Sequence, residues 1–408
     1  MSSKRGILTV IVLAQFCCTS LWFAGNAVMT ELIQHFGLPG PAVAWLTSAV
    51  QLGFISGTLV FALLTVADRF PPSRVFFWSA VLGATFNLGV IAEGQHLGSL
   101  VLLRFATGFF LAGIYPVGMK IAADYFQQGL GQSLGFLVGA LVLGTAFPHL
   151  LRGLLADLPW RAVLMGTSAL AVLGGLLMYL LVPDGPYRKA GQGLDLSAVW
   201  RVFQNRRFRA AAFGFYGHMW ELYAFWAFVP VVLTAYQLAN GGLAYGVSWW
   251  SFAIIGIGGL ACVLGAYLAR SWGTQRTAFV ALSLSGLCCL LSPGVYLYAG
   301  PTLFLGFYLF WGMVVIADSP LFSTLVAQNA IPEIKGTALT IVNCIGFAIT
   351  IFSIQLLDYC RQLLPSAYLY LALVIGPILG LWALTRSPEG PPAAEAPPLQ
   401  RDKKTSGT

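Results

Sequence analysis

Long apolar runs with almost no charge fill most of this 408-residue chain. Charged residues make up only 9% of the sequence, whereas a soluble protein carries roughly 25%. So few charges cannot cover a water-facing surface, so most of the surface must face lipid. The runs are apolar on all sides, and most reach the length of about 20 residues that a helix needs to cross a membrane. The sequence therefore predicts an all-α membrane protein.

The runs predict twelve transmembrane helices. The predicted spans are 7–30, 43–66, 74–92, 98–122, 131–151, 160–182, 209–233, 247–269, 276–293, 301–327, 336–357 and 367–385. The longest connection, 183–208, is rich in arginine, and we expect a surface helix around 195–205 within it. The tail 387–408 is rich in proline and alanine, a composition typical of disorder.

The positions of lysine and arginine predict the orientation. With the N-terminus inside, all but four of the 22 lysines and arginines fall at the inner side. The exceptions are Arg104, Arg152, Arg161 and Arg361. Because basic loops stay in the cytoplasm, this distribution predicts a bacterial inner-membrane protein with both termini cytoplasmic. The net charge of +8 then suits anionic lipid headgroups and requires no nucleic acid.

The long basic loop divides the chain into two halves. The predicted parts are a six-helix bundle 1–182, a linker 183–208, a second six-helix bundle 209–386 and the tail 387–408. Ala67-Asp68-Arg69 after span two resembles Leu268-Ala269-Arg270 after span eight. Ile114-Tyr115-Pro116 in span four resembles Asp318-Ser319-Pro320 in span ten. Such repeats predict paired bundles with a site between them.

Two short motifs resemble those of the major facilitator superfamily of transporters. After span two, Asp68 and Arg69 with the later Arg74 correspond to the family's Asp-Arg and basic residues. In span four, Arg104 and Gly108 match its Arg-x-x-x-Gly stretch. The resemblance covers all twelve spans and implies a central cavity lined by spans one, four, seven and ten. It also implies that Asp68, Arg69 and Arg74 act in gating, by locking the outward-facing state.

Ionisable groups at membrane depth are costly, so they are functional candidates. Glu221 lies near the middle of span seven, and His218 lies three residues earlier on the same face. The two groups could titrate near neutral pH, as proton coupling requires, or contact the substrate, or form a hydrogen-bonded structural lock. Asp318 precedes Ser319-Pro320, where proline can kink the helix. By resemblance, Asp318 is either a coupling carboxylate or a charge that closes the inner gate.

Three further residues are candidates for the site. The guanidinium of Arg104 offers a planar fork of donors suited to carboxylate or phosphate, so it could bind an anionic substrate. It could also pair with a carboxylate of the other half, or tie backbone carbonyls together. Asn26 and Trp22 of span one could line the cavity, although core packing is the commoner role of such aromatics. His149, at the outer end of span five, is expected to reach toward water.

Several motifs are absent from the sequence. It has no GxxxxGK[ST] loop, HExxH or CxxC pair, so we predict a protein that is not an enzyme and holds no cofactor or metal. We predict a monomeric secondary transporter that moves a small organic anion or polar metabolite with protons, because Arg104 is buried in a span. Two alternatives stay open: proton-linked efflux of amphiphilic drugs, and a non-transporting sensor or assembly factor on the same fold.

Overall fold

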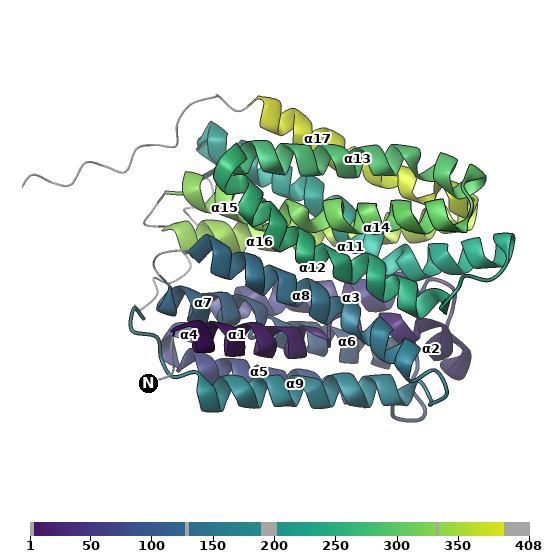
Figure 1. The fold of residues 1–408 in the computed structure, drawn as a ribbon. Coiled ribbons are helices and arrows are strands. Elements are labelled where there is room, and N and C mark those ends of the chain that lie inside the picture. The colour runs from purple at the N-terminus through teal and green to yellow at the C-terminus, as the bar shows by residue number, and fades with distance from the viewer. Residues whose placement is uncertain (1–3, 127–129, 189–201, 332–333, 387–408) are drawn as a thin grey trace, which may run out of the picture.

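The computed structural model describes residues 4–126, 130–188, 202–331 and 334–386, and the regular elements in these ranges are all helices. The prediction of an all-α fold is thereby confirmed. Figure 1 shows the long helices running roughly side by side, with the N-terminus at the left. We call that end of the molecule the inner end and the opposite end, where α2 lies, the outer end.

The first half of the chain contains α1 (Lys4–Thr19), η1 (Asn26–Val28), α2 (Met29–Phe36), α3 (Ala42–Leu63), α4 (Val66–Arg69), α5 (Pro72–Gly89), α6 (Leu97–Leu111), α7 (Tyr115–Tyr125), α8 (Leu130–Leu154) and α9 (Arg161–Leu181). The second half contains α11 (Arg206–Asn240), α12 (Gly246–Trp272), α13 (Thr274–Tyr298), α14 (Pro301–Ala317), α15 (Ser319–Asn329), α16 (Lys335–Leu363), η3 (Ser366–Val374) and α17 (Ile375–Thr385). Helix pairs that follow each other directly, such as α6 and α7, share one predicted span.

Ten of the helices or helix pairs in the described ranges are long and apolar enough to cross a membrane. The shorter helix α1 and helix α5 stand at the positions of predicted spans one and three, so the fold is the twelve-helix arrangement that the sequence predicts. The observed α11 and α16 are several residues longer than their predicted spans. Most of the predicted surface helix around 195–205 and the whole tail 387–408 lie outside the described residues.

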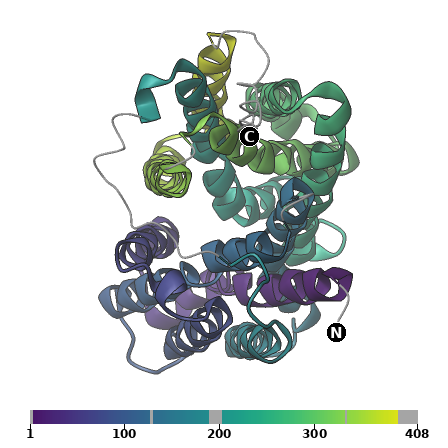
Figure 2. The same ribbon diagram turned by 90° about the vertical axis from the view of Figure 1, so that its left-hand side faces the viewer.

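The helices form two bundles, one from each half of the chain. In Figure 1 the purple-to-blue helices lie below the green-to-yellow ones, and Figure 2 shows the same separation from the inner end. The bundles meet where α8 packs along α12 and where α3 packs along α16. A Cβ atom on Gly139 would lie 3.0 Å from the carbonyl oxygen of Gly259, so α8 and α12 approach each other at glycine.

The predicted span one is not a continuous helix, which corrects the prediction of a single helix over 7–30. Helix α1 ends at Thr19, and the chain becomes helical again only at Asn26. The intervening carbonyl groups of Leu21 and Trp22 accept hydrogen bonds from Arg104, which replaces the bonds that a continuous helix would supply. The break therefore depends on a side chain from another helix.

Spans four and ten break at equivalent places. Helix α6 ends at Leu111 and α7 begins at Tyr115, while α14 ends at Ala317 and α15 begins at Ser319. Each new helix has a proline in its first turn, where the missing N–H is tolerated. The predicted likeness of these two segments and the predicted kink near Asp318 are both confirmed.

Candidate functional site

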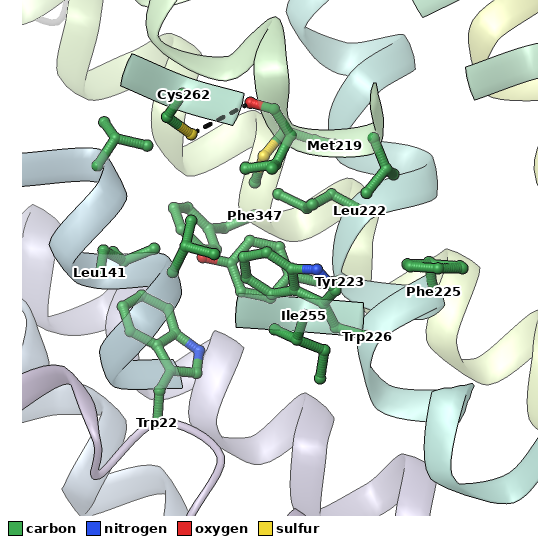
Figure 3. Packing of buried hydrophobic residues seen from close by; sticks show 14 of the residues in the cluster. Trp22, Leu141, Met219, Leu222, Tyr223, Phe225, Trp226, Ile255, Cys262 and Phe347 are labelled. Carbon is green, nitrogen blue, oxygen red and sulfur yellow. Dashed lines mark hydrogen bonds between the residues drawn. The ribbon is translucent and has the colours of Figure 1, made fainter. Parts of the chain in front are cut away.

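Four aromatic side chains from both bundles meet near the centre of the molecule. We call Trp22, Phe54, Tyr223 and Phe347 the aromatic plug. The ring of Trp22 stacks on that of Phe347 with centroids 5.6 Å apart, and it lies 5.7 Å from the ring of Tyr223. Figure 3 shows Trp22 reaching from the first bundle toward Tyr223 and Phe347 of the second. The plug therefore holds the two bundles together across their interface.

The bundles are also tied at the outer end, beyond the plug. The side-chain amide of Gln355 donates to the hydroxyl of Ser48 at 3.0 Å, and Arg361 donates to the carbonyl of Gly40 at 3.0 Å. Both bonds link α16 or its last turn to the start of α3 and the turn before it. The arrangement is thus closed on the outer side of the plug.

A small cavity lies on the inner side of the plug and is bounded by both bundles. Its lining residues are Tyr115, Val138, Leu141, Phe215, Met219, Leu222, Tyr223, Ile316, Ser319, Ser323, Asn343 and Phe347. The lining combines apolar and aromatic surface with a few hydroxyl and amide groups, and none of these residues is charged at neutral pH. Such a wall suits a small molecule with an apolar body and a few polar atoms.

His218 and Asp318 form a buried pair beside this cavity. Nδ1 of His218 on α11 lies 2.8 Å from Oδ1 of Asp318, and both side chains are 1% exposed. Asp318 occupies the break between α14 and α15, directly before Ser319 of the cavity wall. Nε2 of His218 and Oδ2 of Asp318 have no hydrogen-bond partner within the described ranges. The pair therefore places an imidazole and a carboxylate next to the cavity.

Glu221 points to different neighbours from those of His218. Its Oε1 accepts a hydrogen bond from Ser285 at 2.5 Å and another from the indole of Trp311 at 2.7 Å. Glu221 and His218 do not pair with each other, because the imidazole faces Asp318 instead. Glu221 does not line the cavity and lies inside the second bundle among α11, α13 and α14.

Arg104 is buried in the first bundle and contacts no carboxylate among the described residues. Its guanidinium donates to the carbonyls of Leu21 and Trp22 and to Oδ1 of Asn87. Of the roles considered from the sequence, this geometry is that of a tie to backbone carbonyls. A pairing with Glu221 or Asp318 is not present, because those carboxylates have other partners. Arg104 is also not part of the cavity wall.

Comparison with known proteins identifies the family. The sequence matches the model of the Major Facilitator Superfamily over residues 11–354. The chain belongs to this superfamily. It is 27% identical over 246 residues to a probable L-galactonate transporter of Escherichia coli, covering 51% of this chain and 53% of that one. It is 28% identical over 186 residues to the 3-(3-hydroxy-phenyl)propionate transporter of the same species, covering 45% and 43%.

The fold agrees with solved structures of the superfamily. The proton:xylose symporter XylE superposes with a TM-score of 0.73 at 13% identity, covering 95% of this chain and 97% of that one. A likeness at this identity concerns the fold alone. The chain spans about half the length of the curated relatives it matches. The superfamily assignment agrees with the many helices that are long and apolar enough to cross a membrane.

The predicted gating residues of this superfamily member gather at the inner end of the first bundle. Oδ1 of Asp68 lies 2.9 Å from Nζ of Lys120, which joins α4 to α7. Arg188 donates to the carbonyl of Asp68 at 3.2 Å, and Arg69 donates to the hydroxyl of Thr65. These contacts stay within the first half of the chain and the segment that follows it. A gating role for Asp68 and Arg69 stays a prediction.

The remaining predicted residues have defined places. Arg74 is exposed in the first turn of α5. Asn26 donates to the hydroxyl of Thr47 at 2.8 Å, which ties the broken span one to α3. Trp22 is part of the plug, and its indole donates to Gln51. His149 is 2% exposed, so the expectation that it reaches toward water is wrong.

Sequence reasoning missed most of the cavity wall and, in the plug, Phe54 and Phe347. Phe54 and Phe347 are phenylalanines inside long apolar runs, and nothing in their spacing separates them from lipid-facing residues. Ser319 is an exception, because it follows Asp318 in the segment that repeats the sequence around Tyr115. Both residues of that repeat line the cavity. The internal repeat was therefore the signal that could have located the wall.

Proposed function

We propose that this protein is a proton-coupled secondary transporter, in which the pair of His218 and Asp318 carries the coupling proton. The single observation behind the proposal is the position of this pair. It is buried, it flanks the cavity, and it stands at the break between α14 and α15. A change of charge at a helix break can shift the balance between two arrangements of the bundles.

The charge of the pair supports coupling to an anion. With one proton shared between imidazole and carboxylate, the pair is neutral overall, whichever group holds the proton. A second proton gives the pair a net charge of +1 beside a wall without other charges. An isolated charge in such a place is costly, so a carboxylate of the substrate would stabilise it. Proton and organic anion would then enter together, as in symport.

The cavity wall favours a small organic acid with an apolar or aromatic part. Phe215, Tyr223 and Phe347 offer aromatic surface, while Ser323 and Asn343 offer hydrogen bonds. A relative at 28% identity is named as a transporter of an aromatic propionate, and another as a probable transporter of a sugar acid. Arg104 is occupied by carbonyl groups, so the positive charge for the substrate comes from the pair of His218 and Asp318 and not from Arg104.

The test is uptake by purified protein in proteoliposomes. The probes are labelled 3-(3-hydroxyphenyl)propionate and L-galactonate, with and without an imposed proton gradient. Asp318→Asn should abolish gradient-driven accumulation of the transported acid while exchange of labelled for unlabelled acid continues. Asp157→Asn, an exposed aspartate in the loop before α9, is the matched control and should accumulate the acid as wild type does. Accumulation by Asp318→Asn at the wild-type level would refute the proposal.

Efflux of amphiphilic drugs is the second candidate, and the aromatic character of the cavity wall favours it. A lipophilic cation and an organic anion of similar size separate the two functions, because a pair that gains positive charge repels the cation. Proton-driven extrusion of the cation without transport of either acid would support efflux. Absence of flux for acids and cations alike would favour a non-transporting sensor or assembly factor.

A further inference from the structure

A group of buried polar side chains lies nearer the outer end of the molecule than the cavity does. Thr145 and His149 stand one turn apart on α8, and Ser251 stands on α12. Their exposed fractions are 0%, 2% and 0%. The hydroxyl oxygens of Thr145 and Ser251 and Nε2 of His149 have no hydrogen-bond partner in the described part of the chain. We call these three residues the outer polar cluster.

The contacts between α8 and α12 place the cluster at the interface of the two bundles. A Cβ atom on Gly258 would lie 3.4 Å from Val142, and one on Gly153 would lie 2.9 Å from the indole of Trp249. His149 is two helical turns beyond Val142, and Ser251 is two turns before Gly258. Because the helices run in opposite directions, His149 and Ser251 fall at the same level, between these two contacts.

The cluster lies farther toward the outer end of α8 than the cavity wall. Leu141 lines the cavity and lies on the same helix as His149, α8. Eight residues along α8 correspond to about 12 Å at 1.5 Å per residue. Pro148 lies next to His149 and has no N–H for the carbonyl of Gly144, so the helix is one backbone bond short at this level. At this level of the closed interface, several buried polar groups therefore have no hydrogen-bond partner in the described part of the chain.

Buried polar groups without partners are rare in folded proteins, because each costs free energy unless another state or a bound molecule satisfies it. Two bundles that alternate in access would separate at this interface when the outer side opens. We propose that the outer polar cluster is an entry site of the outward-facing state, where it binds the hydroxyl or carboxylate group of the incoming solute. The site rests on the proposed transport function and is distinct from the pair of His218 and Asp318.

The chemistry of the cluster defines what it can hold. The imidazole and the two hydroxyls each donate or accept a hydrogen bond, and they can surround one polar head group. None carries a fixed charge, so a solute would be held by hydrogen bonds and could be released toward the cavity. The charged pair on the inner side of the plug then takes over the polar end. The two sites would act in sequence on one molecule.

Cysteine accessibility tests whether the cluster opens to the outer side. Ser251→Cys is made in a background where the two partly exposed cysteines, Cys344 and Cys360, are serine. A membrane-impermeant thiol reagent is added to either face of sealed vesicles. If the open state is a minor population, Ser251→Cys should react from the outer face at about 0.1–10% of the rate of an exposed thiol. Ser323→Cys in the cavity serves as the control and should react from the inner face.

The outcomes separate this inference from the proposed function. Reaction of Ser251→Cys from the outer face supports the entry site. If Ser323→Cys reacts and Ser251→Cys reacts from neither face, or only from the inner face, the entry site is refuted while the cavity stands. If Ser323→Cys does not react, the cavity of the proposed function fails, and the result with Ser251→Cys still decides the entry site.

A second measurement tests binding by the cluster. His149→Leu should raise the half-saturation concentration of the transported acid at the outer face by about tenfold, as expected for the loss of one buried hydrogen bond. The half-saturation concentration at the inner face should not change. His149→Gln keeps a donor and an acceptor and should restore most of the affinity. Equal changes at both faces, or no change at either, would show that His149 has only a structural role.

Discussion

Replacement of Arg104 by leucine tests whether this side chain holds the broken first span in place. The guanidinium makes four hydrogen bonds: 3.3 and 3.2 Å to the carbonyl of Leu21, 2.6 Å to that of Trp22, and 3.1 Å to Oδ1 of Asn87. Leucine fills much of the space but donates nothing. Three buried acceptors would be left without these donors, and at membrane depth no lipid group can replace them.

The cost can be bounded from these contacts. A buried acceptor that loses its partner costs about 1–3 kcal/mol, which gives at least about 3 kcal/mol for three acceptors. Hydrogen bonds between membrane helices average only about 0.6 kcal/mol, which would reduce the sum to about 2 kcal/mol. Loss of the buried charge offsets part of either figure. We expect a net destabilisation of about 2 kcal/mol, because the carbonyls of a helix break have no alternative partner and the larger figure therefore applies before the offset.

Thermal unfolding in detergent measures this effect. Arg104→Leu should lower the Tm clearly. The Tm of Arg104→Lys should lie between those of Arg104→Leu and the wild type, because an ammonium lacks the planar fork that reaches several acceptors. Arg74→Leu, at an exposed arginine of α5, is the control and should unfold as wild type does. An unchanged Tm for Arg104→Leu, with loss of organic-acid binding, would refute the structural role and restore the interpretation of Arg104 as a substrate ligand.

Three further changes follow from the same contacts. Glu221→Gln should keep the wild-type Tm and gradient-driven uptake, because an amide oxygen accepts the same bonds, whereas Glu221→Leu should lose about 2 kcal/mol or more of stability by stranding two buried donors. Gly108→Val should reduce folded yield in size-exclusion chromatography, because its Cβ would clash with the backbone of Val50; Gly306→Ala, in open space, should not. Trp22→Ala should let an impermeant reagent at the outer face reach Ser323→Cys, and continued protection would contradict the role of the plug.

The sequence predicts the helices well because the membrane imposes their length and composition. Apolar runs of about 20 residues have few alternatives in lipid, so the spans follow from hydropathy alone. Span one was the exception, since its composition is that of a continuous helix. Its break depends on Arg104, which lies about 80 residues away in the chain, and local sequence contains no trace of that contact.

The candidate site was predicted in its residue types but not in its pairings. Depth identified Arg104, His218, Glu221 and Asp318 as costly and therefore purposeful. Which of them meet depends on the rotation of each helix about its own axis, and apolar runs do not fix that rotation. The three-residue spacing of His218 and Glu221 placed them on one side of α11. Even so, the small angle between them turns one toward the break between α14 and α15 and the other toward α13 and α14.

The likeness between the two halves also shows where they differ. The breaks before Tyr115 and Ser319 are equivalent, and both residues line the cavity. The residue before each is Ile114 in the first half and Asp318 in the second, and both are fully buried. A proton can therefore change the charge at only one of these two breaks. In the first half, the buried guanidinium of Arg104 instead ties the helices together through carbonyl groups. If protons drive the cycle, the change of charge that they cause takes place at the break between α14 and α15.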